Sequence, residues 1–377
     1  MRKLIPWWIC AEAVGDEAGI TKESCVQKKH TALVVVSITI LGIDTSCDET
    51  AAAVVVDGRE VLSNVVASQI KVHQEYGGVV PELASRKHIE AINYIINKSL
   101  NEAAVTFDDV DAIAVTNRPG LIGALLVGVA AAKSLAYCYN LPLLGINHIE
   151  GHIYANYMVH DTLTFPHICL TVSGGHTLLV EVHEGWRYKV LGTTQDDAAG
   201  EVYDKVAKYL GLGFPGGRII DELAQKGNST AIDFPRPMLR SGDYQFSFSG
   251  VKTSVRYFVE KAERAGTMEN GEICIEDIAA SFQAAVVDVL VAKTVHAAKT
   301  TDARIITLTG GVAANSHLRS SLKDAANEIG ADVYYPPINL CTDNGAMIAG
   351  IAYEKYRQGL RDGLSLNAAA NGSIVDI

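Results

Sequence analysis

Residues 145–156 read Gly-Ile-Asn-His-Ile-Glu-Gly-His-Ile-Tyr-Ala-Asn and continue an apolar run at 141–146 that is typical of a buried strand. We expect the histidine-containing part to begin a helix. His148 and His152 are four residues apart, so both imidazoles point to the same side of that helix, one turn apart. Two histidines at this spacing can bind one divalent metal ion. The alternative is an ordinary helix start with two unrelated histidines.

The glutamate inside this stretch argues against a protease site. Zinc proteases use the order His-Glu-x-x-His, in which the glutamate directly follows the first histidine. Glu150 is two residues after His148, so it faces a different side of the predicted helix. Any third metal ligand must therefore come from elsewhere in the chain.

Composition narrows the class of protein. The 377 residues allow two domains with separate cores, and the net charge of −11 argues against a broad basic surface. A nucleic-acid partner would need a local basic patch or other subunits. Seven cysteines without Cys-x-x-Cys spacing favour a reduced, cytoplasmic protein with neither a disulfide framework nor a zinc ribbon. We expect residues 1–32 to be a disordered leader rather than a signal peptide.

The order of predicted elements occurs twice along the chain. In each copy a strand leads through two hairpins to a helical region, and two further strands then alternate with helices. We therefore predict an α/β protein with duplicated domains around a central cleft, at 33–164 and 165–377, and a helical insertion in the second at about 196–299. The first copy has strands at 33–43, 51–56, 61–66, 112–115 and 141–146 and helices at 82–103 and 122–139, and the second has strands at 168–172, 178–182, 188–192, 305–308 and 333–335 and a helix at 313–329.

The repeat suggests the third metal ligand. The helix start with His148 and His152 corresponds to a helix start at 341–345, which contains Asp343. A pseudo-twofold axis through the cleft would bring these two helix starts together. Two imidazoles and one carboxylate make a divalent-metal site with open positions that suits iron or zinc. The alternative is that Asp343 only caps its own helix.

Three turns are rich in small and hydroxyl residues. Two are hairpin turns, at 44–50 and 173–177, and the third follows a strand at 309–315. Backbone amides in such turns can hold anionic oxygens, and glycines such as Gly174 and Gly175 allow close approach. The sequence has neither the P-loop nor the dinucleotide-binding motif. The pattern is similar to the hairpin-based phosphate site of the actin-like, sugar-kinase and Hsp70 ATPases.

The predicted insertion contains a charged helix and an aromatic–basic segment, each with two interpretations. Asp197, Glu201 and Asp204 or Lys205 share roughly one helix face, which suits either a site or a solvated surface. Farther along, phenylalanines alternate with basic residues, a pattern that can stack and hold RNA or form the edge of a core. These residues are Phe234, Phe246 and Phe248 with Arg236, Arg240 and Lys252.

Six segments occur in the order of one known family, at residues 42–50, 76–86, 148–152, 172–177, 196–205 and 341–349. Together they resemble the bacterial tRNA threonylcarbamoyl transferases of the TsaD type, and the resemblance extends over residues 41–361. It implies a metal-dependent acyltransferase of the actin-like fold. The implied reaction moves the threonylcarbamoyl group from L-threonylcarbamoyl-AMP to N6 of adenosine 37, in tRNAs reading codons that begin with A, and releases AMP.

The resemblance also implies ligands and partners. His148, His152 and Asp343 would bind one divalent ion, usually iron, with zinc as the alternative. The implied partners are tRNA, a paralogous actin-like subunit of the TsaB type and a small ATPase of the TsaE type, without a membrane. The implied ligands of the adenylate are Thr171, Val172, Ser173, Gly174, Gly175, Asp204, Gly217, Asp221 and Asn315.

Two positions depart from the family pattern. Asp44 stands where glutamate is more usual, which we interpret as a mild change of reach. Arg118 stands in a turn where Gly-Pro-Gly is common, which can alter the loop because arginine takes positive φ less freely than glycine. We expect neither residue to contact a proposed ligand.

The expected chemistry is acyl-type transfer at a carbamoyl carbon, with a metal ion as Lewis acid and turn amides offsetting charge on the departing AMP. An exocyclic adenine amine is a poor nucleophile, so we expect a general base, for which Asp48 and Glu49 are the candidates. The target base must leave its stack to reach the cleft. The alternatives are a metallopeptidase (an older label of this family), a non-catalytic nucleotide-binding scaffold and, by fold alone, a sugar kinase.

Overall fold

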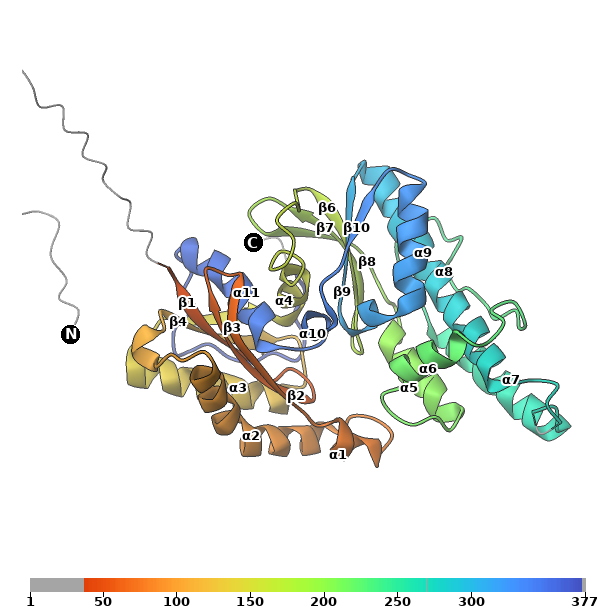
Figure 1. Cartoon of the computed structure of the whole chain (residues 1–377), viewed down its shortest axis with the longest axis horizontal. Coiled ribbons are helices and arrows are strands. Elements are labelled where there is room, and N and C mark those ends of the chain that lie inside the picture. The colour runs from red at the N-terminus through yellow and green to blue at the C-terminus, as the bar shows by residue number, and fades with distance from the viewer. Residues whose placement is uncertain (1–36, 269, 375–377) are drawn as a thin grey trace, which may run out of the picture. The chain divides into compact units, whose positions relative to one another are not determined.

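Two five-stranded mixed sheets form the framework of the protein (Figure 1). The computed structural model describes residues 37–268 and 270–374. The predicted leader at 1–32 lies outside the described residues, as does the start of the strand predicted at 33–43. The other predicted strands and helices are present, with small shifts at their ends.

The first sheet has the strand order β3-β2-β1-β4-β5. Two hairpins make its first three strands antiparallel, and β4 and β5 then join parallel to β1. Small and β-branched residues fill β1, β2 and β4, and nearly all of their side chains are buried, as expected for a sheet covered on both faces. The elements are β1 (Thr39–Asp44), β2 (Glu49–Val56), β3 (Glu60–Ser68), α1 (Ile70–Gln74), α2 (Pro81–Glu102), η1 (Phe107–Asp109), β4 (Ala112–Arg118), α3 (Ile122–Tyr139), β5 (Leu143–Asn147) and α4 (His148–Tyr154).

The second sheet repeats this topology, with the order β10-β9-β6-β7-β8. Its three hairpin strands β6, β7 and β8 are antiparallel, and β9 pairs parallel with both β6 and β10. The predicted duplication is therefore confirmed strand by strand. The elements are β6 (His167–Val172), β7 (Thr177–His183), β8 (Arg187–Thr193), β9 (Ile305–Thr309), η2 (Gly311–Ala314), α9 (Ser316–Asn327), β10 (Asp332–Tyr334), α10 (Ile338–Cys341) and α11 (Gly345–Arg357).

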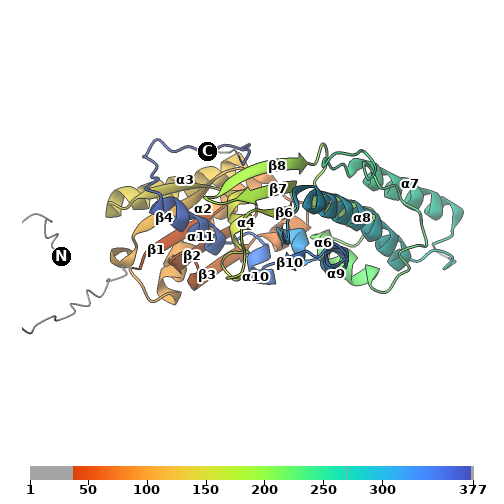
Figure 2. The ribbon, with the colours of Figure 1, turned by 90° about the horizontal axis from the view of Figure 1, so that it is seen from above.

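Four helices lie between β8 and β9, where the sequence predicts an insertion. The last of them, α8, packs against α9 as α2 packs against α3, so α8 corresponds to α2 by its place in the fold. The three helices that precede α8 lie on the side of the second sheet that is away from the first sheet (Figures 1 and 2). The four are α5 (Ala199–Tyr209), α6 (Gly216–Ala224), α7 (Ser249–Ala265) and α8 (Ile275–Thr301).

The last helices of the two halves meet between the sheets. Helix α4 follows β5 and contacts β4 and β5 of the first sheet as well as β6 and β9 of the second, whereas α11 follows β10 but packs against β1 and β2. Glycines permit the second contact, because a Cβ on Gly42 would lie 2.4 Å from the carbonyl oxygen of Gly345. On the other side, Ile149 and Ile153 of α4 share a buried cluster with Val180 of β7. This packing brings the starts of α4 and α11 together.

A C-terminal strap, residues 362–374, returns along the first sheet to α4. The Gly145 amide of β5 donates to the Asp362 carboxylate at 2.7 Å, and the Ala369 amide donates to the last part of β4. The side chain of Ile374 then enters the cluster that holds α4. The sequence pattern predicts none of these contacts.

The phenylalanines of the insertion belong to the core. Phe234, Phe246 and Phe248 are at most 2% exposed and pack in the main cluster of the second half. Their interpretation as an RNA-stacking surface is therefore wrong, and the core alternative is confirmed. The neighbouring Arg236 and Lys252 form ion pairs with carboxylates of the insertion rather than a free basic patch.

Two of the described helices, α3 and α8, are long and apolar enough to cross a membrane by length and composition. Most of α8 is buried inside the protein, as is usual for a core helix. Helix α3 covers the first sheet, where it contacts β4 and α2. These contacts account for the apolar character of α8 and of the buried face of α3, whereas 33% of α3 is buried in all.

His167 gives the folded protein a specific sensitivity to acid. Burial lowers the pKa of His167 to about 4, whereas an unfolded histidine titrates near pH ~6.5. The contribution of His167 to the unfolding free energy is complete above pH ~6.5. It is lost as the pH falls from there toward 4, because in this range only the unfolded state binds the proton. The shift corresponds to about 3 kcal/mol in total.

We predict that lowering the pH from ~7 to ~5 reduces the unfolding free energy of the wild type more than that of His167→Gln. The difference between the two reductions should be about 2 kcal/mol. Urea denaturation at both pH values measures this difference. Comparing the pH dependence, and not the stability at one pH, removes the cost of losing the 3.1 Å contact with the Tyr157 hydroxyl. Equal pH dependence in the two proteins would contradict the assignment.

Candidate metal centre

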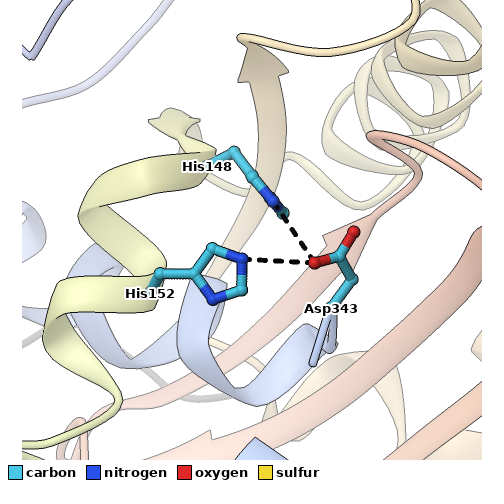
Figure 3. A group of neighbouring side chains, drawn as sticks. All are labelled: His148, His152 and Asp343. Atoms are coloured by element: carbon cyan, nitrogen blue, oxygen red, sulfur yellow. Dashed lines mark ion pairs between the residues drawn. The ribbon is translucent and has the colours of Figure 1, made fainter. Parts of the chain in front are cut away.

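The three predicted metal ligands lie together at the meeting point of α4 and α11 (Figure 3). The Nε2 atoms of His148 and His152 are 3.4 Å and 3.2 Å from the same oxygen, Oδ1 of Asp343. One ligand atom from each residue fits within a span of 4.8 Å. Both imidazoles are buried, and the Asp343 side chain is 19% exposed. The predicted juxtaposition of the two helix starts is confirmed.

Two asparagines begin these helices and leave the ligands free. The Oδ1 atom of Asn147 accepts from the Ile149 amide and caps α4. The Oδ1 atom of Asn344 accepts from the Met347 amide and caps α11. The alternative that Asp343 serves only as the helix cap is therefore wrong, since Asn344 caps the helix and the carboxylate points to the imidazoles.

The donor set fits a divalent ion. Buried polar atoms normally have hydrogen-bond partners, yet both ring nitrogens of His152 and Nδ1 of His148 have none. Two imidazoles and one carboxylate with remaining open positions suit iron or zinc. Two of the unsatisfied nitrogens, Nδ1 of His148 and Nε2 of His152, lie 3.2 Å from the carboxylates of Asp44 and Asp343, so the candidate ligand atoms converge on one place.

The charges of this cluster are strongly coupled. Burial lowers the pKa of His148, but the charges of Asp343 and Asp44 outweigh it and raise that pKa well above its usual value. Burial and the charge of His148 together lower the pKa of His152. Burial raises the pKa of Asp343, but His148 outweighs it and holds that pKa well below its usual range. Because ligand nitrogens must be unprotonated, metal binding would release the His148 proton.

Asp44 contacts a proposed ligand, which corrects the expectation from sequence. Its Oδ2 atom lies 3.2 Å from Nδ1 of His148, and its side chain is fully buried. Its other oxygen, Oδ1, accepts from the Ser46 amide at 3.0 Å. Ser46 also reaches Asp343, with its hydroxyl 3.4 Å from Oδ2. A carboxylate beside a metal-binding histidine orients the ring and selects its tautomer.

The other two positions singled out by sequence lie away from the ligands. Arg118 is the last residue of β4 and pairs in register with Asn147, so its backbone is extended and needs no positive φ. Glu150 faces away from the imidazoles, as predicted, and accepts a 2.6 Å hydrogen bond from Lys355 of α11.

The turn at 173–177 is the open one of the two hairpin turns. Thr171 and Val172 are buried residues of β6 whose backbones pair with neighbouring strands. Beyond them, nothing lies within 4 Å of a Cβ placed on Gly174 or Gly175. Ser173 closes the turn, because its hydroxyl accepts from the His176 amide. The Thr309 hydroxyl donates to the His152 carbonyl at 2.5 Å, and Thr309 pairs with Thr171 at the end of β6, so the turn lies beside the candidate metal ligands. Burial and the charge of His148 lower the pKa of His176 to about 4.

Helix α5 begins on this turn and leads to the next group of candidate ligands. The Gly200 amide donates to the Ser173 carbonyl, and Asp204, one turn later, accepts from the Gly216 amide at 2.7 Å. Burial raises the pKa of Asp204 to about 6. Gly217, in the first turn of α6, has open space on its Cβ side.

Asp221 and Asn315 are joined through a residue that the sequence analysis missed. Gln283 of α8 donates to Asp221 at 3.1 Å and accepts from Asn315 at 2.7 Å. Asp221 also accepts from the amide and hydroxyl of Ser316, and Asn315 caps α9 through the Leu318 amide. The candidate adenylate ligands thus lie at the end of β6, on the 173–177 turn, on α5 and α6, and at Asn315, which Gln283 joins to α6.

The candidate bases Asp48 and Glu49 lie where the first hairpin turn joins β2. His88 of α2 supports this turn, because its Nε2 contacts the Cys47 carbonyl at 2.9 Å and its Nδ1 contacts the Thr50 hydroxyl. Burial, Asp48 and Asp343 raise the pKa of Glu49 well above its usual value. No local pattern identifies His88 or Gln283 in the sequence, because each acts through contacts between distant segments.

Comparison with known proteins decides the family. The TsaD family model, described as tRNA N6-adenosine threonylcarbamoyltransferase, matches residues 60–350. The chain belongs to the TsaD family. A relative of that description from Clostridioides difficile is 52% identical over 334 residues, which are 89% of this chain and 98% of the relative. One from Clostridium novyi is 53% identical over 335 residues, or 89% of this chain and 97% of the relative.

Solved structures confirm the predicted actin-like fold. HypF from T. kodakarensis matches with a TM-score of 0.56 and 14% identity, over 87% of this chain and 50% of HypF. Component A of the (R)-2-hydroxyglutaryl-CoA dehydratase of Acidaminococcus fermentans matches with a TM-score of 0.51 and 15% identity, over 85% of this chain and 99% of that chain. At these identities the likeness concerns the fold alone. Resemblance to the TsaD family, inferred from motifs, is likewise confirmed.

We predict that Asp44→Asn lowers Zn²⁺ affinity about 10–100-fold without unfolding the protein, because the amide no longer holds the His148 ring as the carboxylate does. Competition with a chromophoric chelator measures the affinity. Asp111→Asn is the matched control, since Asp111 accepts from the Thr39 amide at the opposite end of β1. Equal Zn²⁺ affinity in the Asp44 and Asp111 variants would show that Asp44 does not support the ligand.

Proposed function

We propose that the protein transfers the threonylcarbamoyl group from L-threonylcarbamoyl-AMP to N6 of adenosine 37, in tRNAs reading codons that begin with A, and releases AMP. Membership of a family of tRNA-modifying transferases supports the reaction class. The observation that carries the proposal is the placement of His148, His152 and Asp343 beside the open turn at 173–177, where Thr309 contacts His152 and pairs with Thr171. A divalent-ion site next to an anion-binding turn suits a substrate with an activated carbonyl attached to a phosphate.

We infer that His148, His152 and Asp343 hold one divalent ion, Fe²⁺ by analogy with the family or Zn²⁺. A bound ion of this kind would supply Lewis-acid polarisation of a carbamoyl or phosphate oxygen. The rest of the site belongs to the chain. Asp44 orients the His148 ring, and Ser46 donates toward the second oxygen of Asp343.

The adenylate would lie between the 173–177 turn and α6. The space on the Cβ side of Gly174 and Gly175 is open, so a phosphate can approach the backbone of the turn closely. Asp204 and Asp221 are carboxylates that can accept ribose hydroxyls, and Asn315 completes the group through Gln283. Thr171 and Val172 hold the turn in place from β6 rather than through their buried side chains.

The attacking adenine amine must lose a proton as the new bond forms. Glu49 and Asp48, at the first hairpin turn, are the candidate bases. The raised pKa of Glu49 makes its carboxylate a stronger base than an exposed glutamate. In this proposal the base belongs to the first half of the protein and the departing AMP to the second.

The proposed partners are tRNA, a paralogous actin-like subunit of the TsaB type and a small ATPase of the TsaE type. Exposed apolar side chains on α2 and α3 support a protein partner on the first half, because such residues are costly to leave in water when they gather. We place the protein in the cytoplasm and propose domains at 33–164 and 165–377. The exposed residues are Ile89, Tyr94, Ile122, Leu126 and Tyr137.

Nucleoside mass spectrometry tests the function directly. Cells depleted of this protein should lose the threonylcarbamoyl modification from tRNA and regain it on complementation. Unchanged tRNA modification after depletion would contradict the proposal. A peptide-cleavage assay with the purified protein tests the metallopeptidase alternative, for which we expect no activity.

We predict that Glu49→Gln lowers the transfer rate by about 10²–10⁴-fold, the usual contribution of a general base. Zn²⁺ and AMP binding should persist, since Glu49 contacts neither the imidazoles nor the 173–177 turn in the described contacts. Glu60→Gln, at an exposed position on β3, is the control and should transfer at the wild-type rate. Wild-type transfer by Glu49→Gln would move the role of base to Asp48.

We predict that Gly175→Val folds normally but loses at least tenfold in AMP affinity, because its side chain occupies the space above the turn. The fold should tolerate the change, since nothing lies within 4 Å of a Cβ at this position. Gly363→Val, in the C-terminal strap, is the control because its nearest neighbour is 3.7 Å away. Calorimetric titration with AMP measures the affinity, and equal values for the two variants would exclude the turn as the phosphate site.

A further inference from the structure

Outside the metal cluster, α4 and α11 are joined by a buried ion pair that none of the chemistry above uses. The Nζ atom of Lys355 lies 2.6 Å from Oε2 of Glu150. The two side chains are only 14% and 8% exposed. Moving two charges out of water costs free energy, and their attraction offsets that cost only when the geometry of the pair is good.

The pair connects the two helices that define the metal site. Glu150 lies between His148 and His152 on α4, on a different side from the imidazoles. Lys355 is in the last turn of α11, the helix that begins two residues after Asp343. The ion pair therefore fixes the far end of α11 to the helix that carries both histidines.

Two glycines make the contact between these helices unusually close. A Cβ on Gly151 would lie 2.9 Å from Cδ1 of Ile348, and a Cβ on Gly350 would lie 2.8 Å from the Tyr154 ring. Close packing determines how far apart the helices are. Close packing restricts sliding of one helix along the other less, because apolar contacts have little directionality. The short charged hydrogen bond between Glu150 and Lys355 is directional and therefore restricts this sliding.

We infer that Glu150 and Lys355 are a positioning pair, which holds α4 and α11 in the register at which Asp343 meets the two imidazoles. The inference rests on the metal site proposed above and adds to it a requirement located on the opposite side of α4. Neither residue contacts the ligand atoms, so its effect on metal binding must pass through the relative placement of the two helices.

The test measures metal binding by the purified full-length chain with Zn²⁺ and Co²⁺ as probes. Glu150→Gln and Lys355→Met should each bind Zn²⁺ at least tenfold more weakly than the wild type, in proportion to the effect of other groups that orient metal ligands. The visible absorption of bound Co²⁺ should change as well, because it depends on coordination geometry. The exchanged double variant Glu150→Lys/Lys355→Glu should recover affinity beyond the sum of the single changes.

Lys293→Met is the matched control. Lys293 is also a buried lysine, with a side chain 4% exposed and a carboxylate partner in Asp243, but it lies on α8. Its loss should destabilise the protein while Zn²⁺ affinity and the Co²⁺ spectrum stay at wild-type values. A loss of metal affinity common to all three single variants would instead indicate general destabilisation and overturn the inference.

The outcomes separate this inference from the proposed metal site. If the wild type binds neither Zn²⁺ nor Co²⁺, both fail. If the wild type binds them and Glu150→Gln binds equally well with the same Co²⁺ spectrum, the metal site stands and the positioning pair is excluded. Glu150→Gln preserves side-chain volume, so it carries the test even if Lys355→Met does not fold.

Discussion

The packing of α11 against α4 and the first sheet is the contact on which the candidate site depends. Helix α11 follows the last strand of the second half but packs on the first sheet, and α4 contacts strands of both sheets. The approach of α11 to the first sheet requires glycine on both sides, since a Cβ on Gly345 would lie 2.6 Å from the Ala53 amide nitrogen. Two histidines from one half and an aspartate from the other thus come together without any local motif containing all three. The metal site is a product of the duplicated fold.

The charge balance of the buried cluster explains why its nitrogens lack partners. Asp44 and Asp343 bring two negative charges to a region where His148 and His152 are almost fully buried. A single proton on His148 offsets only one of these charges, whereas a divalent ion with neutral imidazoles offsets both. Uncompensated buried charge costs several kcal/mol, on the order of the stability of a whole domain. This charge balance suits a divalent ion.

Local patterns in the sequence predicted the elements, and contacts between distant segments account for what they missed. The apolar, small-residue run at 122–139 predicted α3 with its observed bounds, and the His-x-x-x-His spacing predicted which side chains share a helix face. The expectation that Asp44 would not contact the candidate ligands was wrong. Its position relative to α4 depends on how β1 and β5 are placed in one sheet, which local sequence does not show. Asn344 and Asp343 are adjacent and both suit a helix cap, so sequence alone did not distinguish the cap from the ligand.

Duplication gives two equivalent hairpin turns, yet their packing leaves only one of them open. In the first, the Ser46 carbonyl accepts from the Leu121 amide, and the Thr45 hydroxyl donates to the carbonyl of Ala124. Helix α3 thereby covers that turn, whereas the 173–177 turn has open space at both glycines. The first turn also carries the carboxylates of Asp48 and Glu49, which repel a phosphate group.

This asymmetry gives the proposed reaction a direction. The anionic leaving group is favoured on the second half, where the turn is open and free of carboxylates. The proton of the incoming amine is favoured on the first half, where desolvation and the charges of Asp48 and Asp343 raise the pKa of the half-buried Glu49 and strengthen its carboxylate as a base. Because the metal ligands come from α4 and from the residue two before α11, they lie between these two turns. In the proposed reaction, the acceptor would lie on one side of the candidate metal ligands and the adenylate on the other.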